Sequence, residues 1–154
     1  MNYLELLHSP ILTPRIATLT QKAAYNNIPV FIQGEQGTGK ELVAKLIHHL
    51  GDWKDYRFHK IDCRIFTEET FTAQVSRLFK EFHDGTNPGT LYLREVGYLG
   101  QENQLKLVEL IEEGFFQNGL EKNTLNNLRF ISSSSQDFRD KLFHGRFLED
   151  LYYL

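Results

Sequence analysis

The stretch IPVFIQGEQGTGKELVAKLIHHL, residues 28–50, contains three consecutive patterns that decide the fold. Its apolar start, residues 28–34, ends in glycine and is typical of a short buried strand. The segment GEQGTGKE, residues 34–41, then fits G-x-x-x-x-G-K, with glutamate where serine or threonine usually follows the lysine. Residues 40–50 continue with apolar side chains at helical spacing. A strand, a glycine-rich loop and a helix in this order predict a turn that binds an anion.

The loop has the composition that a phosphate site requires. Glycines let successive backbone N–H groups point inward, and the following helix adds partial positive charge at its N-terminus. Lys40 can reach the terminal phosphates of a nucleotide, whereas Glu41 lacks the hydroxyl that normally helps to hold magnesium. The alternative is a glycine-rich turn with a surface lysine, which the flanking strand and helix disfavour. We predict a nucleotide site made of Gly34, Glu35, Gln36, Gly37, Thr38, Gly39, Lys40 and Glu41.

Strand-like and helix-like segments alternate along the rest of the chain. Further helices are expected at residues 14–26, 71–82, 101–114 (stopped by Gly114) and 135–145. Further strands are expected at residues 57–63, 90–96 and 128–135. Strands that alternate with helices predict an α/β fold, with a parallel sheet covered on both faces and ligands at the carboxyl ends of the strands.

The composition excludes several classes of protein. A chain of 154 residues, 41% of them hydrophobic, is long enough for one domain with its own core, which we expect to span residues 1–154. The net charge of −3 provides no basic field, so we expect no direct DNA contact. No apolar run has membrane-spanning length and no signal peptide is recognisable, so we expect a cytoplasmic protein without membrane contact. The single Cys63 is expected in the core.

Four segments are similar, in order and in wording, to the AAA+ domain of bacterial enhancer-binding proteins, the activators that remodel sigma-54 RNA polymerase. The segments are GEQGTGKELVAKLIHHL, GTLYLREVG, LRFISSSSQDF and GRFLEDLYYL. The resemblance extends from Ser9 to Leu154, and glutamate after the lysine is normal in that family. It implies a P-loop NTPase fold, ATP or ADP as ligand and a role in transcription regulation, and it leaves self-association into a homo-oligomer open.

The chain departs from this family at the residues that serve hydrolysis. The family strand that matches LYLREV, residues 91–96, ends in Asp-Glu, where Asp supports magnesium and Glu polarises the attacking water. Here Arg94 stands at the Asp position, and Glu95 remains as the candidate catalytic residue. Asp62 matches the family Asn that restrains this Glu.

Three other parts of the family pattern are changed or absent. Ser134-Ser135 replace the sensor Thr-Asn, with Ser135 expected at the nucleotide site. Leu148 and Leu154 stand where the family has arginines that act on a neighbouring subunit's nucleotide, and Arg146 lies one turn away. The Gly-Ala-Phe-Thr-Gly-Ala insertion that touches the sigma factor has no counterpart, so we expect no sigma-54 contact. The family's helical lid corresponds to sequence beyond the last residue, so the expected three-layer domain lacks it.

Arg94 reverses the sign of the charge at the position that supports magnesium. Two unit charges about 4 Å apart interact by about 4 kcal/mol at an effective dielectric constant of about 20. Discounted severalfold, this repulsion still weakens magnesium binding about tenfold or more, so we expect magnesium weakly bound or absent and predict no metal ligands. The guanidinium could instead contact a phosphate and partly replace the metal. The alternative is a salt bridge to a surface acid, with the guanidinium turned away from the loop.

Three functions are compatible with this sequence. The leading hypothesis is a nucleotide-binding AAA+ module of a transcriptional regulator, of the response-regulator type, with impaired or absent hydrolysis and with Arg94 at the nucleotide site. The second is a slow ATPase in which Glu95 acts and a partner chain supplies the missing groups. The third is a self-association or interaction module whose loop stays empty.

Overall fold

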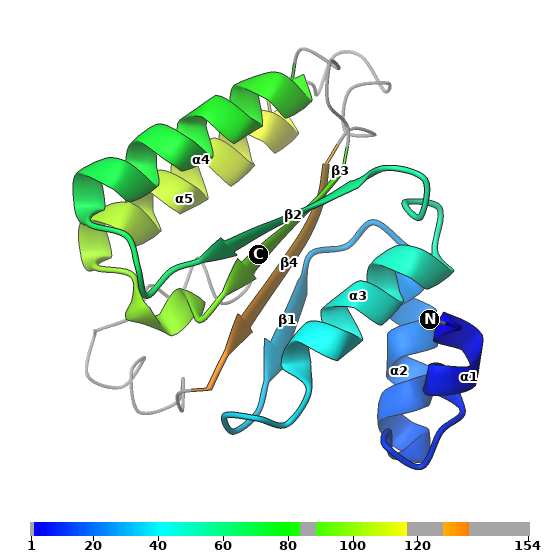
Figure 1. Cartoon of the computed structure of the whole chain (residues 1–154). Coiled ribbons are helices and arrows are strands. Elements are labelled where there is room, and N and C mark those ends of the chain that lie inside the picture. Colours follow the sequence, from blue (N-terminus) through cyan, green and yellow to red (C-terminus); the bar gives the residue numbers. More distant parts are fainter. Residues whose placement is uncertain (1, 84–88, 117–127, 136–154) are drawn as a thin grey trace.

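The computed structural model describes residues 2–83, 89–116 and 128–135 (Figure 1). The helix predicted after residue 135 lies outside the described residues, as do Arg146, Leu148 and Leu154. None of the helices in the described part of the chain is long and apolar enough to cross a membrane.

Four parallel strands form one sheet in the order β1-β4-β3-β2. They are β1 (Val30–Gln33), β2 (Arg57–Asp62), β3 (Gly89–Arg94) and β4 (Leu128–Ser134). Because all four strands run in the same direction, their carboxyl ends meet at one edge of the sheet. This edge carries the segment GEQGTGKE and the Arg94-Glu95 pair, which the sequence placed far apart along the chain.

Helices cover both faces of the sheet, which gives the predicted three-layer α/β arrangement (Figure 1). One face carries α2 (Pro14–Ala24) and α3 (Lys40–Leu50), and the other carries α4 (Glu68–His83) and α5 (Gln101–Phe116). Two short elements were not predicted: α1 (Tyr3–Leu7), and the 3-10 helix η1 (Val96–Tyr98) directly after β3.

The central strand β3 is buried along almost its whole length, and its side chains alternate between the two faces. Leu91 and Leu93 belong to the core under α4 and α5. Tyr92 points the opposite way and packs with Ala44 and Ile47 of α3. Since alternate residues of a strand share a face, Arg94 lies on the same side as Tyr92, toward α3. This alternation is what brings Arg94 to the face of the loop.

Several predicted boundaries are wrong, and three of them have a local cause in the sequence. α5 continues through Gly114 to Phe116, because one glycine costs a helix only about 1 kcal/mol and does not by itself end it. α4 begins at Glu68, three residues before the predicted start, where the Thr67 and Thr70 side chains bond each other's backbone N–H groups. The third strand ends at Arg94 instead of residue 96 because Glu95 leaves the extended conformation.

Candidate functional site

The loop after β1 has the backbone shape that an anion site needs. The Gly34 amide donates to the Ser134 carbonyl over 3.2 Å, which fixes the start of the loop to the end of β4. Gly37 and Gly39 have φ values of +83° and +88°, in the left-handed region that other residues rarely adopt. No side chain caps the N-terminus of α3 at Gly39, so the helix start is left to an external acceptor.

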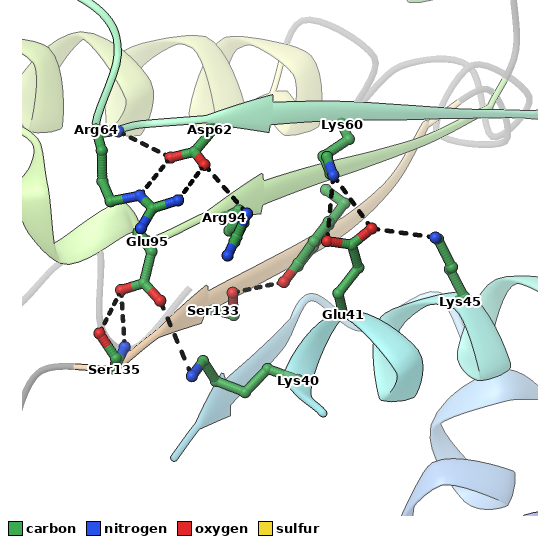
Figure 2. Close-up of polar contacts among 11 residues, drawn as sticks. Lys40, Glu41, Lys45, Lys60, Asp62, Arg64, Arg94, Glu95, Ser133 and Ser135 are labelled. Atoms are coloured by element: carbon green, nitrogen blue, oxygen red, sulfur yellow. Dashed lines mark hydrogen bonds and ion pairs between the residues drawn. The ribbon is translucent and has the colours of Figure 1, made fainter. Parts of the chain in front are cut away.

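Lys40 lies over the loop and is held there. Its Nζ donates to the carbonyl oxygens of Gly34 (2.8 Å) and Glu35 (2.7 Å), and lies 3.9 Å from Glu95 Oε1 (Figure 2). Only 9% of the lysine side chain is exposed. The alternative of a surface lysine on a glycine-rich turn is therefore wrong, and a positive charge sits above the loop.

Glu95 is buried and firmly oriented. Its backbone has φ 59° and ψ 45°, the only left-handed non-glycine conformation among the described residues. Such a conformation costs about 1–2 kcal/mol, and local contacts must hold it. The carboxylate Oε2 accepts from Ser135 N (2.9 Å) and from Ser135 Oγ (2.7 Å). Glu95 and Ser135, both predicted at the site, are thus brought together with Lys40.

Arg94 is paired with Asp62, its direct neighbour in the register between β2 and β3. Arg94 Nη1 donates to Asp62 Oδ2 over 3.3 Å. A salt bridge of Arg94 exists, as the alternative expected, but its partner is not a surface acid. Only 16% of the Asp62 side chain is exposed, and Asp62 lies at the same edge of the sheet as the loop. Figure 2 shows Arg94 between the group around Glu95 and the group around Glu41.

Asp62 has a second and closer cationic partner. Arg64 donates to both carboxylate oxygens, from Nε over 2.9 Å and from Nη2 over 2.6 Å, and its backbone N–H donates over 3.1 Å. These bonds from Arg64 lower the pKa of Asp62, burial opposes them, and the charge of Arg94 adds to the lowering. Asp62 therefore keeps its negative charge near neutral pH, and three of its four hydrogen bonds come from Arg64.

Glu41 points away from the loop toward two lysines. Its carboxylate lies 3.1 Å from Lys45 Nζ and 3.2 Å from Lys60 Nζ. Burial raises the pKa of Glu41, but the bonds from Lys45 and Lys60 outweigh it, so the pKa lies below its ordinary value. Of the residues predicted at the loop, Glu41 is the one whose side chain is committed elsewhere, and only its backbone remains at the loop.

The structure adds groups that the sequence did not indicate. Lys60 was missed because its partner Glu41 lies 19 residues away on α3. Arg64 was also missed, although it follows its partner Asp62 by only two residues. Lys45 was recoverable, because it follows Glu41 by four residues on one helix and such pairs attract.

An apolar cavity of about 470 Å³ opens beside the loop, between α2 and β1. Gly34, Thr38 and Lys40 line it at the loop. The remaining lining is mostly apolar and includes Leu12, Ile16, Leu19, Val30, Ile32 and Val43. The helical spacing placed Ile16 and Leu19 on one face of α2, and these residues are 40% and 52% exposed because the cavity opens beside them.

The strand–loop–helix unit, the lysine over the loop and the acid after β3, two strands away from β1, together have the arrangement of a P-loop. The family model of the sigma-54 interaction domain matches residues 8–154. The chain belongs to this family. Its AAA+, P-loop NTPase fold, predicted from the sequence, is confirmed.

The proteins similar to this sigma-54 interaction domain include a Nif-specific regulatory protein and NtrX. The Nif-specific regulatory protein of Azorhizobium caulinodans is 31% identical over 157 residues, which cover 94% of this chain and 25% of that protein. NtrX from Brucella abortus, in a crystal structure with ATP, is 27% identical with a TM-score of 0.74, over 94% of this chain and 35% of that chain. The P-loop NTPase domain of a sigma-54 transport activator from E. coli has the same fold, with a TM-score of 0.63 and 21% identity, over 89% of this chain and 98% of that chain. The chain spans about half or less of the length of the curated relatives that it matches, from 55% down to 22%.

Proposed function

We propose that this sigma-54 interaction domain, residues 1–154, binds ATP or ADP and hydrolyses ATP slowly or not at all. It would serve as the nucleotide-responsive module of a cytoplasmic bacterial transcriptional regulator, without direct contact to DNA, membrane or sigma-54. The observation that carries the proposal is the loop at residues 34–41, with left-handed Gly37 and Gly39, an uncapped helix start and Lys40 held over its carbonyl groups.

The phosphates would lie in the loop. The first N–H groups of α3 have no intrahelical acceptor, and the partial positive charge of the helix start favours an anion there. Lys40 would exchange a carbonyl partner for a phosphate oxygen, which is a stronger, charge-assisted acceptor. Gln36, Gly37 and Thr38 complete the backbone that surrounds the phosphates.

The base and ribose would enter the apolar cavity beside the loop. Its volume of about 470 Å³ falls within the range of small-molecule pockets, and apolar walls with a few polar groups are typical of them. Support also comes from NtrX of Brucella abortus, which has been crystallised with ADP and with ATP.

Two features oppose hydrolysis. The Glu95 carboxylate already accepts two bonds from Ser135 and faces Lys40, so a water molecule would compete with these donors for it. Arg94 places a cation where the family has the acid that supports magnesium. Phosphoryl transfer depends on positioning and charge neutralisation, and both are altered here.

Titration of a fluorescent ATP analogue tests the proposal. The full chain is expected to bind saturably, and Lys40→Ala to bind at least about tenfold more weakly, since a hydrogen bond between charged groups contributes about 1.5–3 kcal/mol. Lys106→Ala is the matched control, because Lys106 lies on α5 with 38% of its side chain exposed and pairs with Glu109. Absence of binding at millimolar nucleotide, or equal binding by Lys40→Ala, would end the proposal and favour a pure interaction module.

A slow ATPase is the second candidate, and the orientation of Glu95 favours it. A catalytic glutamate needs a fixed position, and the strained backbone and Ser135 provide one. A partner chain, in a homo-oligomer, would then supply the groups that the family places at residues 148 and 154. Phosphate release that depends on protein concentration and disappears in Glu95→Gln would support this function.

A further inference from the structure

The charges around the loop determine which form of the nucleotide fits. Figure 2 labels eight charged side chains at this edge of the sheet: the cations Lys40, Lys45, Lys60, Arg64 and Arg94, and the anions Glu41, Asp62 and Glu95. With Glu35 of the loop included, the net charge is +1 when all are ionised. A polyanion finds its counter-charge in the protein, whereas a divalent cation meets a field of its own sign.

The carboxylates at this edge do not fit magnesium. Magnesium demands near-octahedral oxygen ligands and usually takes one or two free carboxylates besides phosphate and water. Glu41 is paired with two lysines, and Asp62 is held by Arg64. Glu95 accepts from Ser135. Each carboxylate would have to give up existing partners, and Arg94 stands at the supporting position.

Arg94 can exchange its partner Asp62 and take over the neutralising role. Among the described residues its guanidinium has one hydrogen bond, the 3.3 Å contact of Nη1 with Asp62, and 33% of the side chain is exposed. Asp62 would keep its closer bonds to Arg64 if Arg94 moved away. The move therefore leaves no buried carboxylate without a partner. A guanidinium also matches phosphate through two parallel N–H groups.

We propose that this domain binds the metal-free form of a nucleoside di- or triphosphate, with Arg94 leaving Asp62 to contact a phosphate in place of magnesium. The inference rests on the proposed nucleotide binding and adds to it the form of the ligand and the exchange of a salt bridge. Lys40 and the loop amides hold the phosphates from one side, and Arg94 holds them from the tip of β3.

The experiment measures the affinity of the full chain for a fluorescent ATP analogue in excess magnesium chloride and in EDTA. The wild type is expected to bind at least as tightly in EDTA as in magnesium chloride, because excess magnesium converts the free nucleotide into its magnesium complex. Arg94→Gln is expected to bind about tenfold more weakly or worse in EDTA, the loss of one charge-assisted bond. Arg77→Gln is the matched control, since Arg77 lies on α4 with 81% of its side chain exposed.

Arg94→Asp provides a second variant, which restores the family acid and is expected to bind only when magnesium is present. Thermal melts of all variants establish that they fold. If the new aspartate beside Glu95 prevents Arg94→Asp from folding, Arg94→Gln still decides the test. Wild-type binding that requires magnesium would overturn the inference and leave the proposed function intact. If the wild type binds without magnesium and Arg94→Gln binds equally well, Arg94 does not contact the nucleotide and the inference is wrong. Absence of binding under both conditions would instead overturn the proposed function.

Discussion

The loop between β1 and α3 and the tip of β3 lie at the same edge of the sheet, yet they differ in what their residues are free to do. At the loop, the glycines, the uncapped helix start and Lys40 are arranged around a place for an anion. At the tip, Arg94 and Glu95 are occupied by partners within the chain, Asp62 and Ser135. The difference leads us to expect that phosphate binding and phosphate cleavage depend on separate parts of this edge, so that binding can remain where cleavage is impaired.

The largest expected effect comes from breaking the contact that joins the two regions. Tyr92 is 1% exposed, packs against α3 and donates or accepts a 2.7 Å bond with Ser133. Tyr92→Ala should lower the free energy of unfolding by about 3–5 kcal/mol, the usual range for a buried aromatic side chain. Urea denaturation measures it, with Tyr25→Ala, at a 63% exposed position, as the control. A loss below about 1 kcal/mol would show that the loop helix and the strand tip are stabilised independently.

Acid should weaken the same junction. His48 of α3 bonds Thr90 of β3 over 2.7 Å, and burial, together with the charge of His49, lowers the pKa of His48 from 6.5 to about 4. Because the folded state binds this proton more weakly than the unfolded state, the stabilisation is complete above pH 6.5 and is lost as pH falls from 6.5 to 4. The loss approaches about 3 kcal/mol at most.

Denaturation of wild type and His48→Gln between pH 7 and pH 4 isolates this effect. The wild type should lose more stability than the variant over that interval, because glutamine does not titrate. Parallel curves for the two proteins would mean that other groups cause the acid sensitivity.

The loop alone can be perturbed through its backbone. Gly39→Ala should cost about 1–2 kcal/mol, because alanine is strained at φ +88°, and should weaken nucleotide binding without affecting the strand tip. Gly100→Ala is the control, since an added Cβ there meets only the end of the Glu68 side chain. Denaturation and nucleotide titration on both variants make the measurement. Unchanged binding by Gly39→Ala would contradict the assignment of the loop as the phosphate site.

The smallest expected effect concerns hydrolysis. Glu95→Gln should leave ATP turnover within about twofold of the wild-type rate, because that rate is expected near background once Arg94 has replaced the supporting acid. Phosphate release in excess magnesium compares the two proteins. A clearly lower rate of phosphate release in Glu95→Gln would show that Glu95 still supports hydrolysis. The strand tip would then be a slow catalytic site and not an inactive one.

The sequence predicted the loop region better than the strand tip. Both ends of α3, Lys40 and Leu50, agree with the predicted helix. The order of the predicted strands and helices was also correct in the described residues, where only the short α1 and η1 were missed. At the strand tip, the partner of Arg94 was not predicted, because Asp62 lies 32 residues away. The site residues themselves stay predictions until a ligand is tested.

What the sequence determined by itself are the features that depend on neighbours along the chain: glycines where φ must be positive, apolar spacing that makes α3 amphipathic, and Lys40 at its start. Only the tertiary structure decided that Arg94 meets Asp62 and that Ser135 holds Glu95, whereas Arg64 reaches the Asp62 carboxylate from two residues away. The reason is physical. Backbone conformation and helical periodicity act over a few residues, whereas the partner of a charge is set by strand register, which folding alone establishes.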